Sequence, residues 1–241
     1  MLRLHAVGEN GHKVSQYFKS ALPAAIFLDH SFPLDIHSAI LRQTRIVETM
    51  LVADRDINTE FSGSTMSLCI ILNGKLFATN IGNSRCIIGQ GKSHGKIRAV
   101  QLTQDHIPEN EIEKHRIKSK GGRIFAVNYD DFTCGKSKIW LGHMDVPGLT
   151  ISRSLGDTVA TTVGVISLPE CSTYNLNLDT KYLVVATDGI WEMMQNQEII
   201  DVLCSTNSVS KALNIICAES YSRWMDKEQV VDDITMFVFR F

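Results

Sequence analysis

Three aspartates stand beside apolar runs that have the length and composition of strands. Asp188 and Asp105 each follow such a run, and Asp232 precedes one. Carboxylates gathered at strand ends, with no histidine or thiolate among them, favour hard, oxygen-preferring cations such as Mg²⁺ or Mn²⁺. The alternative is that each aspartate only forms a turn at the end of its strand. The spacing by itself leaves both interpretations open.

Two further segments resemble part of a phosphate-binding loop. Gly91-Lys92-Ser93 and Gly135-Lys136-Ser137 match the end of that motif. The motif also needs a glycine five positions before its second glycine, and those positions hold Cys86 and Asp130. Both segments are therefore predicted to be ordinary turns.

The charge balance excludes two classes of partner. The 241 residues contain 24 Lys+Arg and 26 Asp+Glu, which gives a formal net charge of −2. A near-neutral chain without a polybasic segment gains little from the counterion release that drives nucleic-acid binding, or from attraction to anionic lipid. We therefore expect neither nucleic acid nor a membrane as a partner. The six cysteines include no CxxC pair, which favours a reducing cytoplasmic or nuclear location.

Hydrophobic periodicity indicates the elements that would position these aspartates. Apolar residues recur at helical spacing in five segments, the first of which should stop before Pro23. These predicted helices cover residues 10–22, 34–56, 108–120, 198–204 and 209–220. Shorter β-rich runs cover residues 67–72, 76–81, 86–90, 97–102, 163–168, 182–186 and 234–241. Residues 129–137 are predicted to be a polar surface loop, and a specificity flap is the alternative. The pattern predicts one α+β domain with layers of helix and sheet.

Seven ordered segments resemble the metal-dependent PPM (PP2C-type) protein serine/threonine phosphatases. Residues 8–14 are similar to the end of the family's Asp-Gly-His-Gly motif and its following helix, and Asp232-Asp233-Ile234-Thr235 is similar to its closing motif. The other five matches are residues 63–65, 80–85, 102–108, 148–157 and 186–192. Seven matches in the family's order rarely arise by chance.

This resemblance implies a four-layer α/β/β/α sandwich of two antiparallel sheets flanked by helices. It implies hydrolysis of phosphoserine and phosphothreonine in proteins by water activated by Mg²⁺ or Mn²⁺, two ions per site, with no side-chain nucleophile. Asp188 and Asp232 match the family's core metal ligands, and Asp105 matches a ligand of its third site. Glu192, where the family has Asp, and Gly189 are possible outer-sphere residues. We expect phosphoprotein substrates and a monomer.

The first motif departs from the family. Aligning Gly8 with the last glycine of Asp-Gly-His-Gly puts His5 at the bridging aspartate and Ala6 at the glycine whose carbonyl binds metal. Imidazole can ligate one ion but cannot bridge two as a carboxylate does. The resemblance therefore predicts that residues 1–241 form a single domain without the family's first strand and most of its first metal motif.

Two hypotheses follow from this departure. The first is an active phosphatase whose first strand and metal motif lie upstream of Met1. The second is a pseudophosphatase with a degraded metal site, which regulates by binding phosphoproteins or partner proteins. The family favours the enzyme, whereas the absent bridging carboxylate predicts little or no activity for residues 1–241 as written.

Overall fold

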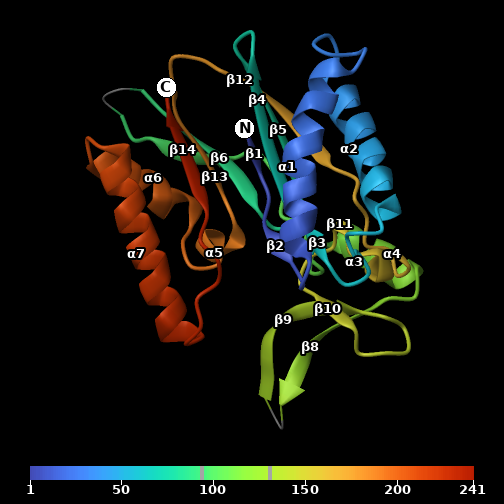
Figure 1. The fold of residues 1–241 in the computed structure, drawn as a ribbon. Helices are drawn as coiled ribbons and strands as arrows, with labels where there is room; N and C mark the ends of the chain where they lie inside the picture. The colour runs from blue at the N-terminus through green and yellow to red at the C-terminus, as the bar shows by residue number, and fades with distance from the viewer. Residues whose placement is uncertain (93–94, 130–131) are drawn as a thin grey trace.

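The computed structural model describes residues 1–92, 95–129 and 132–241, and its centre is a pair of four-stranded antiparallel sheets (Figure 1). The first sheet has the order β1-β4-β5-β12 and the second the order β14-β13-β6-β7. The strands of the first sheet are β1 (Leu2–Arg3), β4 (Met66–Leu72), β5 (Lys75–Ile81) and β12 (Glu170–Asn175). Those of the second are β6 (Arg85–Gln90), β7 (Arg98–Gln101), β13 (Thr180–Ala186) and β14 (Met236–Arg240).

The period of two in β13 shows how the layers form. Leu183 and Val185 pack between the two sheets with Cys69, Leu76, Ala78, Cys86 and Ile88. The alternate residues Tyr182, Val184 and Ala186 face the helices on the other side. Because both faces of β13 are covered, its sequence is a continuous apolar run and does not alternate with polar residues.

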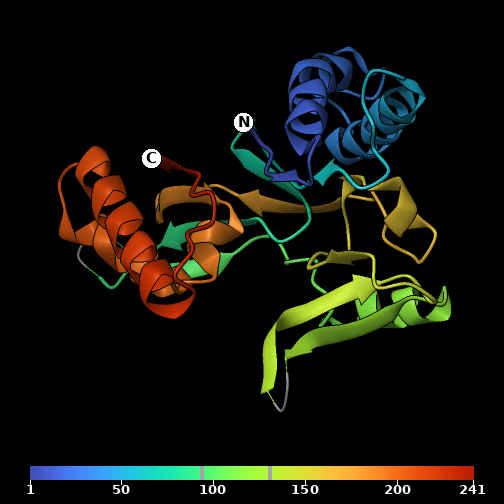
Figure 2. The same ribbon diagram turned by 60° about the horizontal axis from the view of Figure 1, so that its bottom comes forward.

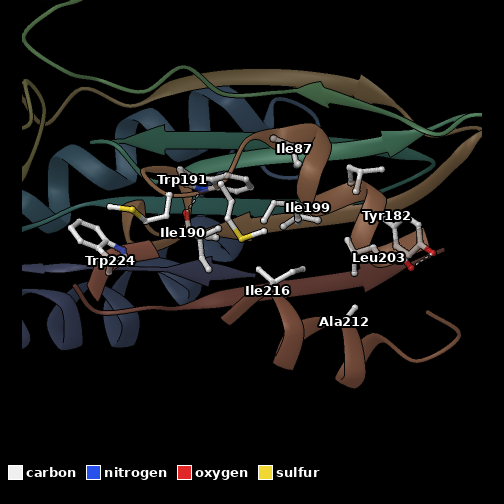
Figure 3. Packing of buried hydrophobic residues seen from close by; sticks show 14 residues of the cluster. Ile87, Tyr182, Ile190, Trp191, Ile199, Leu203, Ala212, Ile216 and Trp224 are labelled. Carbon is white, nitrogen blue, oxygen red and sulfur yellow. Dashed lines mark hydrogen bonds between the residues drawn. The ribbon is translucent and has the colours of Figure 1, made fainter. Parts of the chain in front are cut away.

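Helices cover the outer face of each sheet, which confirms the predicted α/β/β/α sandwich. Helices α1 (Gly11–Leu28) and α2 (Ile36–Ala53) pack on the first sheet through a core that contains Phe18, Leu22 and Met66. Helices α6 (Asn196–Ser205) and α7 (Val209–Lys227) cover the second sheet, where Ile199, Ile216 and their neighbours interdigitate (Figure 3).

Two smaller sheets complete the molecule. One contains β8 (Arg123–Tyr129), β9 (Phe132–Trp140) and β10 (Pro147–Leu149), and it projects from the sandwich at the end away from the chain termini (Figure 2). The other contains β2 (Ala6–Val7), β3 (Gly63–Ser64) and β11 (Leu155–Gly156). Helix α3 (Glu111–Ser119) precedes β8, and the short helices α4 (Thr158–Thr161) and α5 (Asp188–Trp191) follow β11 and β13.

The structure corrects three local predictions. The first helix does not stop at Pro23 but continues to Leu28, because burial of Leu22 and Ile26 outweighs the cost of an interior proline. Residues 163–168 do not form a strand: Gly164 has a φ of +93°, which an extended chain cannot adopt, and the strand here is β12. The predicted polar loop at 129–137 is largely the β8–β9 hairpin, and its residues 130–131 lie outside the described residues.

The segment before α1 pairs with two of the sheets. Leu2 and Arg3 pair with Leu68 and Ser67 at the edge of the first large sheet. Ala6 then pairs with Ser64 in the small β2–β3–β11 sheet. His5 lies between these two short strands, so the pairing on both sides of it fixes the place of its backbone in the fold.

Candidate metal centre

Asp188 is the first residue of α5, directly beyond the end of β13. The Thr187 N–H donates to the Thr235 carbonyl at 3.0 Å, and the Thr235 N–H donates to Thr187 Oγ1 at 3.1 Å. These bonds hold the end of β13 against the chain that enters β14. Gly189 allows the close approach, since a Cβ there would lie 2.6 Å from the Asp233 carbonyl oxygen. Asp232 is thereby brought beside Asp188.

Buried side chains beneath α5 hold the connection between β13 and α5 in place. Trp191 Nε1 donates to the Ala186 carbonyl at 2.8 Å (Figure 3), and Trp224 Nε1 donates to the Gly189 carbonyl at 2.7 Å. Ser220 Oγ donates to the same Gly189 oxygen at 2.6 Å. The backbone on each side of Asp188 is therefore tied to buried side chains, which leaves the aspartate little freedom to move.

His5 approaches Asp188 from the opposite sheet. Its carbonyl accepts hydrogen bonds from the Thr65 N–H and from Ser64 Oγ, each at 2.9 Å. Its Nδ1 lies 4.0 Å from Asp188 Oδ1, and the two side chains are 15% and 14% exposed. The first strand pair and the β13–β14 pair thus place an imidazole opposite a carboxylate.

One ligand atom from each of His5, Asp188 and Asp232 lies within 4.8 Å of the others. This separation and this donor set fit one divalent cation. Of the residues predicted from the sequence, the structure brings together Asp188 and Asp232, and it adds His5, the position predicted to be degraded. Ala6 contributes no polar side chain, and it pairs with Ser64 in β2.

The electrostatics of the group favour an added positive charge. Burial raises the pKa of Asp232, the neighbouring Asp188 charge raises it further, and a hydrogen bond from the Asp233 N–H acts against them. Asn83 Nδ2 donates to Asp188 Oδ2 at 2.8 Å, which orients the carboxylate without neutralising it. Within the described residues, no arginine forms an ion pair with either aspartate.

His106 fixes the turn that carries Asn83. Its backbone N–H donates to the Gly82 carbonyl at 2.9 Å, and its Nδ1 accepts from the Gly82 N–H at 3.1 Å. Burial and, to a lesser extent, the charge of Arg153 lower the pKa of His106 to about 3. The imidazole is therefore neutral at physiological pH, as an acceptor at Nδ1 must be.

Asp105 and Glu192 lie near the three-residue group but are not members of it. Arg85 clamps Asp105 with two hydrogen bonds, Nε to Oδ1 at 2.9 Å and Nη2 to Oδ2 at 2.6 Å. Lys136 forms an ion pair with Glu192. Each of these carboxylates, both predicted for an outer metal site, is thus paired with a cation of the chain itself.

A cavity of about 260 Å³ opens over this region. Its lining includes Asn83, Asp188, Glu192, Lys136 and Lys227. Burial lowers the pKa of Lys136, and the negative charge of Asp188 acts against that shift. Sequence patterns indicated no functional role for either lysine. Lys136 belonged to a segment predicted to be a turn, and β9 carries it to the cavity. Lys227 ends α7, and only the tertiary packing shows that this end reaches the cavity.

Comparison with known proteins identifies the family of this chain. The model of the protein phosphatase 2C family matches residues 3–231. The chain belongs to this family. Among curated members, "Probable protein phosphatase 2C 72" of Arabidopsis thaliana is 31% identical over 242 residues, which covers 95% of this chain and 72% of that protein. "Probable protein phosphatase 2C 12" of rice is 34% identical over 173 residues, which covers 71% of this chain and 43% of that protein.

A solved structure confirms the protein phosphatase 2C fold. Serine-threonine phosphatase 2C from Toxoplasma gondii superimposes with a TM-score of 0.76 at 19% identity, covering 100% of this chain and 84% of that one. At this identity the likeness establishes the fold alone. In the part of the chain that the structure describes, no helix has both the length and the apolar composition needed to span a membrane.

Proposed function

We propose that this protein phosphatase 2C domain removes phosphate from phosphoserine and phosphothreonine side chains of proteins in the presence of Mg²⁺ or Mn²⁺. One observation carries the proposal: His5, Asp188 and Asp232 converge from separate segments within 4.8 Å of one another, and Asp188 lines a cavity with two lysines. Membership of the protein phosphatase 2C family supports a protein phosphatase activity.

The side chains around the cavity suggest a division of roles. His5, Asp188 and Asp232 would hold a divalent cation, which would lower the pKa of a bound water and offset charge on the phosphate. Asn83 holds the Asp188 carboxylate in a fixed orientation through its amide. The ammonium groups of Lys136 and Lys227 provide the positive charge that attracts a phosphate dianion into the cavity.

The Glu192 carboxylate modulates this attraction. Its ion pair with Lys136 holds the ammonium at the cavity wall. An incoming phosphate competes with Glu192 for that ammonium, because phosphate carries more charge and more acceptor oxygens than a carboxylate. We propose that Lys136 exchanges partners when substrate enters, so that its contribution is to substrate binding.

The function is tested with the purified chain and a phosphothreonine peptide, by measuring released inorganic phosphate with Mg²⁺, with Mn²⁺ and with chelator. We expect metal-dependent release, and Asp188→Asn should lower kcat/KM by at least about 100-fold. The matched control is Asp201→Asn, an exposed carboxylate on α6, which should leave the rate unchanged. Peptide binding without release under either metal would contradict the proposal and would favour a phosphoprotein-binding domain.

The setting of this activity is also part of the proposal. We propose that the domain acts as a monomer on phosphoproteins in the cytoplasm or nucleus. Free thiols at Cys69, Cys86, Cys171, Cys204 and Cys217 support a reducing compartment. Fractionation of cells and sedimentation of the purified chain test the compartment and the monomer separately.

A further inference from the structure

The ligand set at the metal centre contains a nitrogen donor. His5 contributes an imidazole nitrogen, whereas Asp188 and Asp232 contribute carboxylate oxygens. Mg²⁺ prefers six oxygen ligands, of which several are usually water, and it gains little from imidazole. First-row transition-metal dications bind imidazole more strongly, in an order that rises from Mn²⁺ towards Zn²⁺. The presence of His5 in place of a carboxylate therefore affects which ion the site prefers as well as the net charge of the site.

The nearby carboxylates do not restore an oxygen-only centre for two ions. Each imidazole nitrogen has one lone pair, so the His5 atom that faces Asp188 can bind one ion and cannot bridge a pair. Asp105 is clamped by Arg85, and Glu192 is paired with Lys136. Among the described residues, the group of potential metal ligands that remains is His5, Asp188 and Asp232. Three protein ligands are typical of catalytic sites that hold a single ion with an open position.

The chain holds these three ligands ready before an ion binds. Two hydrogen bonds to its carbonyl fix the His5 backbone. The Asp188 carboxylate accepts from Asn83 Nδ2 on one oxygen and from the Gly189 N–H, at 3.1 Å, on the other. The Asp233 N–H orients Asp232 in the same way at 2.7 Å. A preorganised site discriminates between ions through its donor types, because its ligands cannot rearrange to suit each ion.

We propose that His5, Asp188 and Asp232 form a site for one transition-metal dication, which binds Zn²⁺ more tightly than Mn²⁺ and Mn²⁺ far more tightly than Mg²⁺. This inference deepens the proposed function, on whose ligand residues it rests, by naming the number and class of ion. His5 is the residue that sets the selectivity.

Calorimetric titration of the purified chain with MgCl₂, MnCl₂ and ZnCl₂ tests the proposal without any measurement of turnover. We expect one high-affinity Mn²⁺ per chain, with a Kd lower than that for Mg²⁺ by on the order of 100-fold. His5→Asp should reduce this Mn²⁺/Mg²⁺ ratio at least about tenfold by replacing the nitrogen donor with oxygen. His5→Ala and His5→Gln should weaken Mn²⁺ and Zn²⁺ binding much more than Mg²⁺ binding.

The matched control is His115→Ala, an exposed histidine on α3, which should leave all three Kd values unchanged. Circular dichroism of each variant verifies folding, and the His5→Gln side chain preserves most of the volume if His5→Ala unfolds. Equal Mn²⁺/Mg²⁺ ratios in wild type and His5→Asp would overturn the proposal, as would two tightly bound ions in wild type.

The outcomes also separate this inference from the proposed function. Selective, His5-dependent binding of one ion without phosphopeptide hydrolysis would leave the inference standing and contradict the proposed function. Hydrolysis supported equally by Mg²⁺ and Mn²⁺, with binding that does not depend on His5, would support the function and overturn the inference.

Discussion

Carboxylates in two regions of this molecule are stabilised in opposite ways. On α3, Glu113 is 2% exposed and accepts hydrogen bonds from Arg116, Arg153 and Ser152 at 2.7 to 2.8 Å. Burial by itself would raise the pKa of Glu113, but these hydrogen bonds lower it overall. At the cavity, Asp188 and Asp232 face each other with His5 and Asn83 as their neighbours.

The difference separates a structural carboxylate from the two proposed metal ligands. An acid that already has arginine partners is complete in the folded chain, and it gains nothing from a metal ion. Two carboxylates that repel each other and have no arginine partner carry uncompensated negative charge. A bound dication would compensate this charge and remove the repulsion. Compensation by the chain's own cations therefore separates structural acids from metal ligands.

The largest expected effect is the loss of metal binding when one proposed ligand is removed. Asp232→Ala removes one of three ligands, so the Mn²⁺ affinity should fall by on the order of 1,000-fold in calorimetric titration. The same change relieves repulsion with Asp188, so the metal-free variant should unfold in urea at the same or a higher concentration than wild type. A metal-free variant that is strongly destabilised would show that Asp232 has a structural role.

A second change removes the carboxylate charge that two arginines share. Glu113→Gln leaves Arg116 and Arg153 without their shared carboxylate and should lower the free energy of unfolding by about 3 kcal/mol, as measured by urea denaturation. The loss should be equal with and without Mn²⁺. Glu111→Gln, on the exposed face of the same helix, should change stability by less than about 0.5 kcal/mol. Equal effects of the two substitutions would contradict the account.

The smallest effect concerns a carboxylate that is stabilised by neither means. Glu48 on α2 accepts a hydrogen bond from the Gly156 N–H at 2.9 Å, while its Oε2 is buried without a partner. Burial and, to a lesser extent, the charge of nearby Asp157 raise the pKa of Glu48 to about 7, against the effect of the Gly156 hydrogen bond. This third carboxylate is thus accommodated by a bound proton.

The sign of the resulting pH dependence follows from proton uptake. Between the ordinary value of 4.5 and about 7, the folded chain binds more protons at Glu48 than the unfolded chain does. Its stabilising contribution is therefore present below pH 4.5 and is lost as the pH rises through 7. Glu48→Gln should gain about 2 kcal/mol relative to wild type between pH 5 and pH 8.5 in urea denaturation. A pH-independent difference would contradict the assignment.

The sandwich, and two of the three residues of the proposed metal centre, could be predicted from the sequence for identifiable reasons. Period-two and helical patterns depend on burial, so the main strands and helices and the positions of Asp188 and Asp232 could be inferred from them. Local sequence rules failed at Pro23 and at Gly164. Tertiary packing continues α1 through Pro23, and the backbone conformation of Gly164 prevents the predicted strand.

The third ligand and the cavity lysines depend on contacts between distant segments. His5 looked like a lost carboxylate because a motif comparison scores residue identity, whereas the strand pairing on both sides of it carries its imidazole to Asp188. Lys136 had no local signature, and its role follows from the hairpin that brings it to Glu192. The arginine that engages Asp105 likewise could not be inferred from spacing along the chain.

X-ray absorption spectroscopy of the chain loaded with one equivalent of Mn²⁺ tests most directly whether the three uncompensated side chains bind one ion together. We expect a first shell of oxygen and nitrogen with the outer-shell scattering of one imidazole, which disappears in His5→Ala and persists in His115→Ala. A wild-type spectrum that contains oxygen ligands alone, or an imidazole signal that survives His5→Ala, would contradict this expectation.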